Sequence, residues 1–341
     1  MSGKKLPVKI FFVDESKMRT VAVESSTKAR DLVKLLAEKE ELPPDQYDRF
    51  KLFLQKQGEE RCLDDAEEPL SIMVWETSGA DQNVLDHQSP EAWGKVKNAW
   101  ETTQQARFVF KYRIFLQETL PENENFIKLL YDQAIHDVRY GVIRPSMEDL
   151  VSLAGLQMQV DFKDHDPSKY TKDFLAGIIG NLIPQPLIPE NNMDTWQDLI
   201  YKEHRKNLGM NQYSAERAYL DIASKQPLYG ATLWRVKLTN ALDMKLPENL
   251  YLAVYCEGIL LLADTPQREE LMKHSFSDIY SWAYKHSAFA FVSGTVSKQK
   301  FQFETRYGKE IANTLQAYVN VLMSIYTANK GEGSSGTSSS K

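Results

Sequence analysis

The side chains that could do chemistry in this chain form no recognisable catalytic or metal-binding pattern. Its six histidines are scattered, without H-E-x-x-H or paired Cys/His spacing. Residues 177–180 lack the Lys and Ser/Thr of a phosphate-binding loop. Three aspartates surround His165, but the ligand order of an EF-hand is absent, so a solvated acidic loop is favoured. We therefore expect no enzyme, no metal site and no cofactor.

Aromatic side chains in residues 280–286 point instead to binding. Tyr280, Trp282 and Tyr284 alternate along a stretch that resembles a strand, and alternation places all three on one face. A Trp on an edge strand gives a bound peptide a large apolar contact at a low entropy cost. A Trp in a β-sandwich can equally face the core, so both interpretations stay open.

The elements around these aromatics form a strand-rich C-terminal region. Strands are expected at residues 231–238, 250–256, 258–264, 280–286, 288–293 and 299–305. After Gly308 the apolar period changes to three and four residues, which predicts one long helix. Strands closed by a single helix indicate a PH/PTB-like sandwich with an open edge strand that can accept an extended peptide. The predicted peptide-binding residues are Tyr280, Ser281, Trp282, Ala283, Tyr284, Ile311 and Leu315.

Basic residues lie on or beside the last predicted strands. Lys285, Lys298, Lys300 and Arg306 form a candidate patch for anionic lipid, although scattered solubilising charge explains them as well. Only the C-terminal third of the chain has more basic than acidic side chains, and the net charge of the chain is −6. Nucleic-acid binding needs a concentrated basic face, so we do not expect it.

The N-terminal part predicts two further lobes. Residues 6–76 follow the order ββαββ of a ubiquitin-like roll, with a helix capped by Thr27 and a last strand at residues 70–75. Residues 77–106 are polar and contain a helical stretch with Trp93 and Trp100, which we take as an ordered linker. From residue 107 the pattern changes to helices at 122–142, 147–162, 173–183, 194–208 and 215–225. Short loops between helices indicate a compact bundle.

We therefore predict an α+β chain with five parts. Residues 1–78 form the ubiquitin-like lobe, 79–106 a linker with a helix, and 107–228 a helical-bundle lobe. Residues 229–330 form the PH/PTB-like lobe, and 331–341 a flexible Gly/Ser tail. The longest apolar run, residues 259–263, is too short to span a bilayer. Cys62 and Cys256 are expected to be reduced thiols in the cytosol.

Two motifs link this order of lobes to a known family. Residues 126–162 match the pattern LLYxQAxxDxxxG…LAGxQxQxxF, and residues 275–291 contain an Ile-x-x-Trp-Ala segment at Ile279, Trp282 and Ala283. The chain resembles FERM domains, whose cloverleaf joins a ubiquitin-like roll, an acyl-CoA-binding-protein-like bundle and a PH/PTB-like sandwich. It looks most like the talin head, and the tails of MyTH4-FERM myosins come next.

The resemblance implies a protein–protein interaction adaptor in the cytoplasm, at the cell cortex and peripheral to the plasma membrane. Its partners would be the Asn-Pro-x-Tyr-type cytoplasmic tail of an adhesion receptor and a phosphoinositide membrane, with the actin cytoskeleton reached indirectly. As a myosin tail, it would instead bind motor cargo, with an amphipathic partner helix in a cleft between lobes, and regulate autoinhibition. A regulatory module of a FERM-bearing kinase or phosphatase is a third, less favoured reading.

Overall fold

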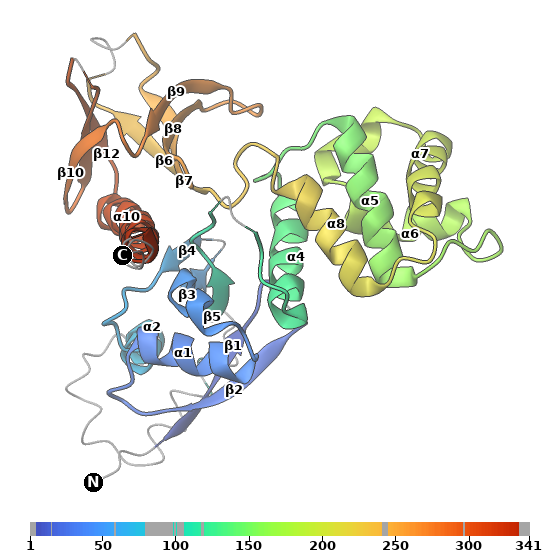
Figure 1. Ribbon diagram of the computed structural model, residues 1–341, viewed down its shortest axis with the longest axis horizontal. Coiled ribbons are helices and arrows are strands. Elements are labelled where there is room, and N and C mark those ends of the chain that lie inside the picture. The colour runs from blue at the N-terminus through green and yellow to red at the C-terminus, as the bar shows by residue number, and fades with distance from the viewer. Residues whose placement is uncertain are drawn as a thin grey trace, which may run out of the picture. The chain divides into compact units, whose positions relative to one another are not determined.

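The computed structural model describes residues 5–14, 16–57, 59–78, 98, 100, 106–116, 119–240, 245–295 and 297–333. The chain divides into two compact units. The first contains the ubiquitin-like and helical lobes up to Tyr229, and the second contains residues 114–117 and everything from Gly230 (Figure 1). Within the described residues, no helix has the length and apolar content needed to cross a membrane. The lobe boundaries expected from the sequence stay a prediction.

A five-stranded sheet forms the first lobe, in the order β2-β1-β5-β3-β4. Its strands are β1 (Leu6–Phe11), β2 (Met18–Val23), β3 (Phe50–Lys56), β4 (Glu59–Cys62) and β5 (Ala106–Tyr112). Helix α1 (Ala29–Lys39) buries Leu32 and Leu36 completely and packs against β3, while the short helix η1 (Pro44–Arg49) leads into β3. The expected hairpin between the first two strands is present, with Val8 opposite Val21.

Two expectations for this region are wrong, and one strand was not predicted. Residues 70–75 form part of helix α2 (Pro69–Ser78), because Leu70, Met73 and Val74, spaced as on one helix face, are all buried. Lys28, not Thr27, is the N-cap residue of α1, and its side chain makes no capping hydrogen bond. The hydroxyl of Thr27 instead accepts a hydrogen bond from the Glu24 amide. The sequence did not predict β5, which pairs with both β1 and β3 and so belongs to the first sheet.

The expected linker lies almost entirely outside the described residues, including Trp93. Trp100 is described, and its indole is buried in a stack on Phe108 of β5, with ring centroids 5.1 Å apart. Trp100 therefore packs against the first lobe.

The helical lobe contains α4 (Glu124–Arg139), α5 (Met147–Phe162), α6 (Lys172–Leu182), η3 (Gln185–Glu190), α7 (Met193–Lys206) and α8 (Gln212–Ala223). All five predicted helices are present within a few residues of their expected ends. Asparagine, serine or threonine side chains cap each α-helix by accepting a hydrogen bond from a backbone amide in the first turn. Trp196 is fully buried, and Tyr131 meets Tyr219 edge to face at 5.0 Å.

The third lobe is a seven-stranded sheet, in the order β10-β11-β12-β6-β7-β8-β9, with one long helix. Its elements are β6 (Thr232–Leu238), β7 (Asn249–Tyr255), β8 (Gly258–Ala263), β9 (Glu270–Ser275), β10 (Ile279–Lys285), β11 (Ala288–Ser293), β12 (Gln299–Glu304) and α10 (Gly308–Gly333). The sequence did not predict β9. Helix α10 packs against β10, β11 and β7, and it includes the first three residues of the expected tail (Figure 1). The remainder of that tail lies outside the described residues.

Candidate peptide-binding site

Strand β10 is one edge of the third-lobe sheet. It pairs antiparallel with β11, and within the described residues no strand lies on its other side. Its residues are mostly exposed, and α10 packs beside it. An edge strand next to a helix presents unpaired backbone groups to an incoming chain, which is the geometry required for strand addition.

The inner side of β10 carries two of the three predicted aromatics. Trp282 lies opposite Phe291, and Tyr284 lies opposite Phe289, so both point to the same side as these buried rings. Trp282 is half-buried at the margin of the core, and Tyr284 is 48% exposed. Trp282 thus packs on the core without being fully buried, and its role in peptide binding stays a prediction.

A β-bulge places Tyr280 elsewhere. Ile279 pairs with Ser293 and Ser281 pairs with Val292, so Tyr280 is an extra residue without an opposite partner. Its ring is 68% exposed, and the Lys298 ammonium lies 3.2 Å from the ring centroid. The expectation that Tyr280 shares one face with Trp282 and Tyr284 is therefore wrong, because a bulge breaks the two-residue period.

The most deeply buried apolar residues of α10 pack into the core of the third lobe. Ile311 and Leu315 are fully buried in the sandwich core, so the structure places them under the sheet rather than along an open groove. Tyr307, Ala317 and Val321, which the sequence analysis did not select, are half-buried at the margin of the same core. Tyr307 directly precedes α10, Ala317 is next to the buried Tyr318, and Val321 follows Tyr318 by three positions.

Gly308 allows the helix to begin close to the edge strand. A Cβ atom at this position would lie 2.5 Å from the carbonyl oxygen of Ala288 and 3.3 Å from that of Lys285. These two carbonyls flank the turn between β10 and β11. The first turn of α10 therefore contacts the end of the candidate acceptor strand directly.

The predicted basic residues differ in their surroundings. Lys285, Lys298 and Lys300 are exposed, and none of them forms an ion pair with a described residue. Arg306 donates a hydrogen bond to the hydroxyl of Tyr307 at 2.6 Å, and its guanidinium lies over the Tyr307 ring. Their assignment to lipid stays a prediction.

Acidic residues near His165 serve the fold of the helical lobe. Asp164 accepts hydrogen bonds from the Gln159 side chain and the Gly209 amide, both at 2.8 Å, and these bonds hold its pKa below the ordinary value. Asp166 accepts from both the amide and the hydroxyl of Ser168. Over the part of the chain that the structure describes, no group of three or more His, Cys, Asp or Glu side chains could hold a metal ion.

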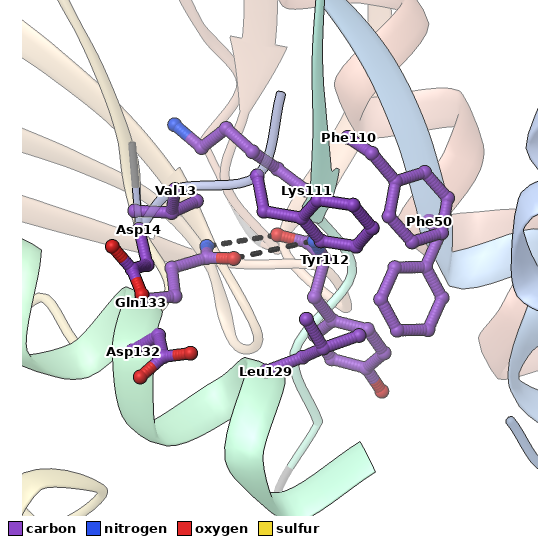
Figure 2. Close-up of a pocket in the computed structure, with 10 residues that line it drawn as sticks. Val13, Asp14, Phe50, Phe110, Lys111, Tyr112, Leu129, Asp132 and Gln133 are labelled. Carbon is purple, nitrogen blue, oxygen red and sulfur yellow. Dashed lines mark hydrogen bonds between the residues drawn. The ribbon is translucent and has the colours of Figure 1, made fainter. Parts of the chain in front are cut away.

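A small pocket lies where the first lobe meets the helical lobe (Figure 2). Its floor is apolar and includes Phe50 and Phe110, which stack 4.8 Å apart, while Asp14, Asp132 and Gln133 form its polar rim. Burial raises the pKa of Asp132, and the neighbouring Lys128 opposes that rise. The pocket has room for little more than a water molecule, so we assign it to the joint between the lobes rather than to a ligand.

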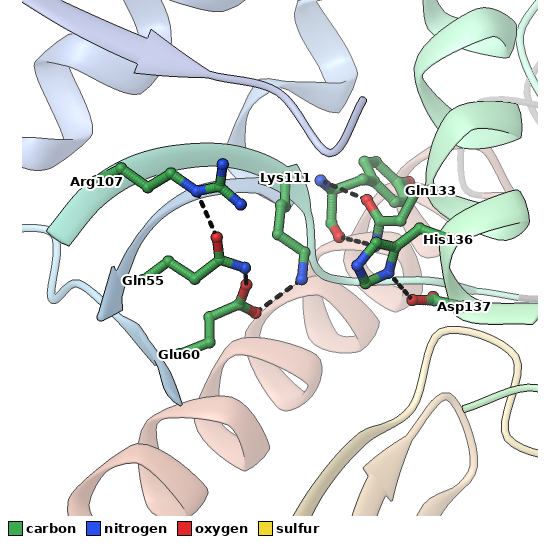
Figure 3. Close-up of polar contacts among 8 residues, drawn as sticks. Gln55, Glu60, Arg107, Lys111, Gln133, His136 and Asp137 are labelled. Atoms are coloured by element: carbon green, nitrogen blue, oxygen red, sulfur yellow. Dashed lines mark hydrogen bonds and ion pairs between the residues drawn. The ribbon is translucent and has the colours of Figure 1, made fainter. Parts of the chain in front are cut away.

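A row of polar contacts runs across the first sheet (Figure 3). Arg107 donates to Gln55 at 2.6 Å, and Lys111 donates to Glu60 at 2.7 Å. Burial favours a lower pKa for Lys111, but the carboxylates of Glu60 and Asp137 outweigh burial and raise it. The side chains of this row are already paired with one another, which leaves β10 as the better candidate site.

Comparison with known proteins agrees with this architecture. Three family models match in order: the Ras association (RalGDS/AF-6) domain at residues 4–88, the FERM central domain at 117–234, and the PTB domain (IRS-1 type) at 236–323. The fold and these matches define a three-lobed protein-interaction module with a PTB-like third lobe. The chain is a FERM domain, with talins and MyTH4-FERM myosins among its distant relatives.

Similarity to individual proteins is low but extends over most of the chain. Talin from Oscarella pearsei is 22% identical over 337 residues, which cover 94% of this chain and 12% of that protein. The FERM and C-terminal domain complex of Drosophila Merlin shares the fold, with a TM-score of 0.71, 16% identity, and coverage of 95% of this chain and 98% of that one.

The C-terminal MyTH4-FERM domain of human Myosin 7b, solved with the harmonin-a PDZ3 domain, gives a TM-score of 0.69 and 20% identity. That match covers 94% of this chain and 60% of the myosin chain. The chain thus spans only a small part of the talin and about three-fifths of the myosin structure.

Proposed function

We propose that this FERM domain is an adaptor that links the cytoplasmic tails of membrane and adhesion proteins to the actin cytoskeleton. The tail, of the Asn-Pro-x-Tyr type, would add as an extra strand along β10. The observation that carries the proposal is the open β10 edge, with Trp282 half-buried beside α10. The match of residues 236–323 to PTB domains supports it. Such an adaptor would act in the cytoplasm at the cell cortex.

The test is the affinity of the chain for a fluorescein-labelled Asn-Pro-x-Tyr-type tail peptide, measured by anisotropy. Trp282→Ala removes the apolar contact beside the edge and should weaken binding at least tenfold, as expected for truncating an anchor residue. Trp75→Ala is the matched control, because Trp75 is 59% exposed on α2 of the first lobe. Equal affinities for the wild type and Trp282→Ala would place the site elsewhere.

The same proposal includes a contact with anionic phospholipid through Lys285, Lys298 and Lys300. Their exposure without ion-pair partners in the described part of the chain supports it. Arg306 contributes less to the proposed patch, since its side chain is held on Tyr307. Co-sedimentation with vesicles that contain a phosphoinositide should fall in the triple Lys→Met variant. Unchanged sedimentation would remove lipid from the proposal.

An alternative is the cargo-binding, autoinhibitory FERM domain of a MyTH4-FERM myosin tail. The structural match to human Myosin 7b, solved with a PDZ partner, supports this reading. Here the ligand would bind away from β10, so its affinity would be unaffected by Trp282→Ala. A cargo segment that binds the wild type and Trp282→Ala equally well would favour the myosin alternative over the adaptor.

A further inference from the structure

The edge strand does not offer its whole length to an added strand. At the bulge, β10 has one more residue than the paired segment of β11, and this extra residue, Tyr280, has no partner opposite it. A bulge bends its strand and interrupts the regular spacing of backbone donors and acceptors. Natural sheets use bulges and lysines to keep edges from pairing. The regular part of β10 begins at Ser281 and continues to Lys285.

Tyr280 and Lys298 stand together at the bulge. The Lys298 ammonium lies 3.2 Å from the centroid of the Tyr280 ring, in a cation–π contact between two exposed side chains. Lys298 directly precedes β12, so it belongs to the turn from β11 to β12. The amide of Gly294 in that turn donates to the carbonyl of Asp278 at 3.0 Å, which holds the turn beside the start of β10.

The outer face of these strands is positive at the bulge end. The register places Ser281, Val292 and Lys300 in one row across β10, β11 and β12. At the other end the row contains Lys285, Ala288 and Glu304, where a carboxylate accompanies the lysine. The row that contains Lys300 has no carboxylate. Neither Lys298 nor Lys300 forms an ion pair with a described residue.

The middle of this face has small side chains on β10 and β11, and Gln302 of β12 completes the row. Ala283 lies opposite Ala290, so the row between the two ends contains only methyl groups on β10 and β11. An extended peptide on the β10 edge would meet Lys285 of β10 at one end of the regular segment. At the bulge end it would meet Lys298, whose ammonium lies over the Tyr280 ring of β10. Lys300 and Glu304 lie on β12, two strands away from β10.

We propose that strand addition is confined to residues 281–285, and that Lys298 binds a carboxylate at the bulge end of the added peptide. The ligand class is thus a short extended peptide with an acidic residue at one end. Lys298 exchanges the Tyr280 ring for this carboxylate when the peptide binds. The inference rests on the proposed function and specifies the extent and charge preference of the same site.

The first test is a double-mutant cycle between protein and peptide. A single Asp is moved along a fluorescein-labelled tail peptide, and the affinity of each version is compared with its Asn counterpart. At one position, Asp should improve affinity by up to about fivefold, the size expected for an exposed ion pair. The gain should vanish in Lys298→Met and persist in Lys245→Met, a change at an exposed lysine of the loop between β6 and β7.

Hydrogen exchange supplies the second readout. Peptide binding should protect amides within 281–285 and leave those of Ile279 and Tyr280 unprotected. Protection that extends through the bulge would overturn the proposal, as would an Asp gain that survives in Lys298→Met.

The outcomes separate this inference from the proposed function. If the tail peptide does not bind, or binds Trp282→Ala equally well, the proposed function fails and this inference fails with it. If the peptide binds through Trp282 without any Asp gain, only this inference fails. If Lys298→Met lowers only the binding of phosphatidylserine vesicles, the lysine contacts lipid, and its assignment to peptide is overturned.

Discussion

The side-chain amide of Gln133 on α4 pairs with the main chain of Tyr112 on β5 as a neighbouring strand would. The Tyr112 amide donates to Gln133 Oε1 at 3.2 Å, and Gln133 Nε2 donates to the Tyr112 carbonyl at 2.9 Å (Figure 2). Both residues are buried. Nearby, Asn125 of α4 donates to the carbonyl of Glu40 at the end of α1. The first and helical lobes are thus joined by hydrogen bonds from side chains of α4 to the main chain of the first lobe, as well as by apolar packing.

Gln133→Ala should destabilise the first unit by about 1–3 kcal/mol, because it removes both hydrogen bonds between the Gln133 side chain and the buried main chain of Tyr112. Urea denaturation followed by far-ultraviolet circular dichroism measures the change. Gln316→Ala, at an exposed position of α10, is the control and should change stability by less than about 0.5 kcal/mol. A loss of the same small size for both variants would show that the Gln133 pair does not stabilise the joint.

Alanine substitutions at two glycines of the helical lobe should change its stability in opposite directions. A Cβ atom on Gly155 would lie 2.6 Å from Glu203 Cβ and 2.9 Å from the His204 amide nitrogen, so α5 and α7 approach closely there. Gly155→Ala should cost about 1–3 kcal/mol through overpacking. Nothing lies within 4 Å of a Cβ atom on Gly177 in α6, and Gly177→Ala should stabilise by up to about 1 kcal/mol. Thermal unfolding of both variants tests this. A change of stability in the same direction for both variants would contradict the close packing at Gly155.

His274 makes the third lobe sensitive to acid. Its ring is buried between Phe291 and Phe301, Nδ1 lies 3.0 Å from the Ser293 hydroxyl, and Nε2 is buried without a partner. Burial lowers the pKa of His274 below 6.5, and the charge of Asp278 only partly opposes this. The unfolded chain therefore binds a proton at a higher pH than the folded chain does.

Stability of the third lobe should be complete above pH 6.5 and fall as the pH drops toward the folded pKa of His274. The midpoint of urea unfolding, recorded from pH 7.5 to 5.0, checks this, and the imidazole resonances in NMR spectra report the titration directly. His274→Gln should remove part of the pH dependence, whereas His286→Gln, at an exposed position after β10, should leave it unchanged. An identical pH profile for His274→Gln and the wild type would argue against this role.

Gly308→Val should separate the start of α10 from the β10–β11 turn, because its side chain would overlap the carbonyl of Ala288. The expected result is a loss of affinity for the tail peptide greater than the loss of stability explains. Peptide affinity and thermal unfolding, measured on the same sample, distinguish the two. Gln316→Val, placed further along the exposed side of α10, should bind peptide normally. Normal binding by Gly308→Val would show that the site tolerates a shift of the helix.

Most of the helical lobe could be predicted from the sequence, because the apolar stripe and the capping residue that define each helix lie close together in the sequence. Met147–Phe162 was predicted with its exact ends, since an apolar stripe and a capping Ser146 act within one helix. Likewise, alternating residues and the turn at residues 14–17 were enough to place the first hairpin. The family motif named Gln133 without revealing that its partner is the main chain of Tyr112.

Non-local contacts decided the rest. The sequence alone determined the α+β class and the order of the three lobes, because periodicity and motif spacing are properties of neighbouring residues. The choice of the strand with Trp282 as the edge came from the resemblance to the FERM family. Whether residues 70–75 form a strand or a helix depended on which of them are buried. The bulge at Tyr280 and the contact of that ring with Lys298 depended on how β11 and β12 align with β10. Only the tertiary structure brings residues from different strands together, and their pairing energy selects one register among several that the local pattern allows.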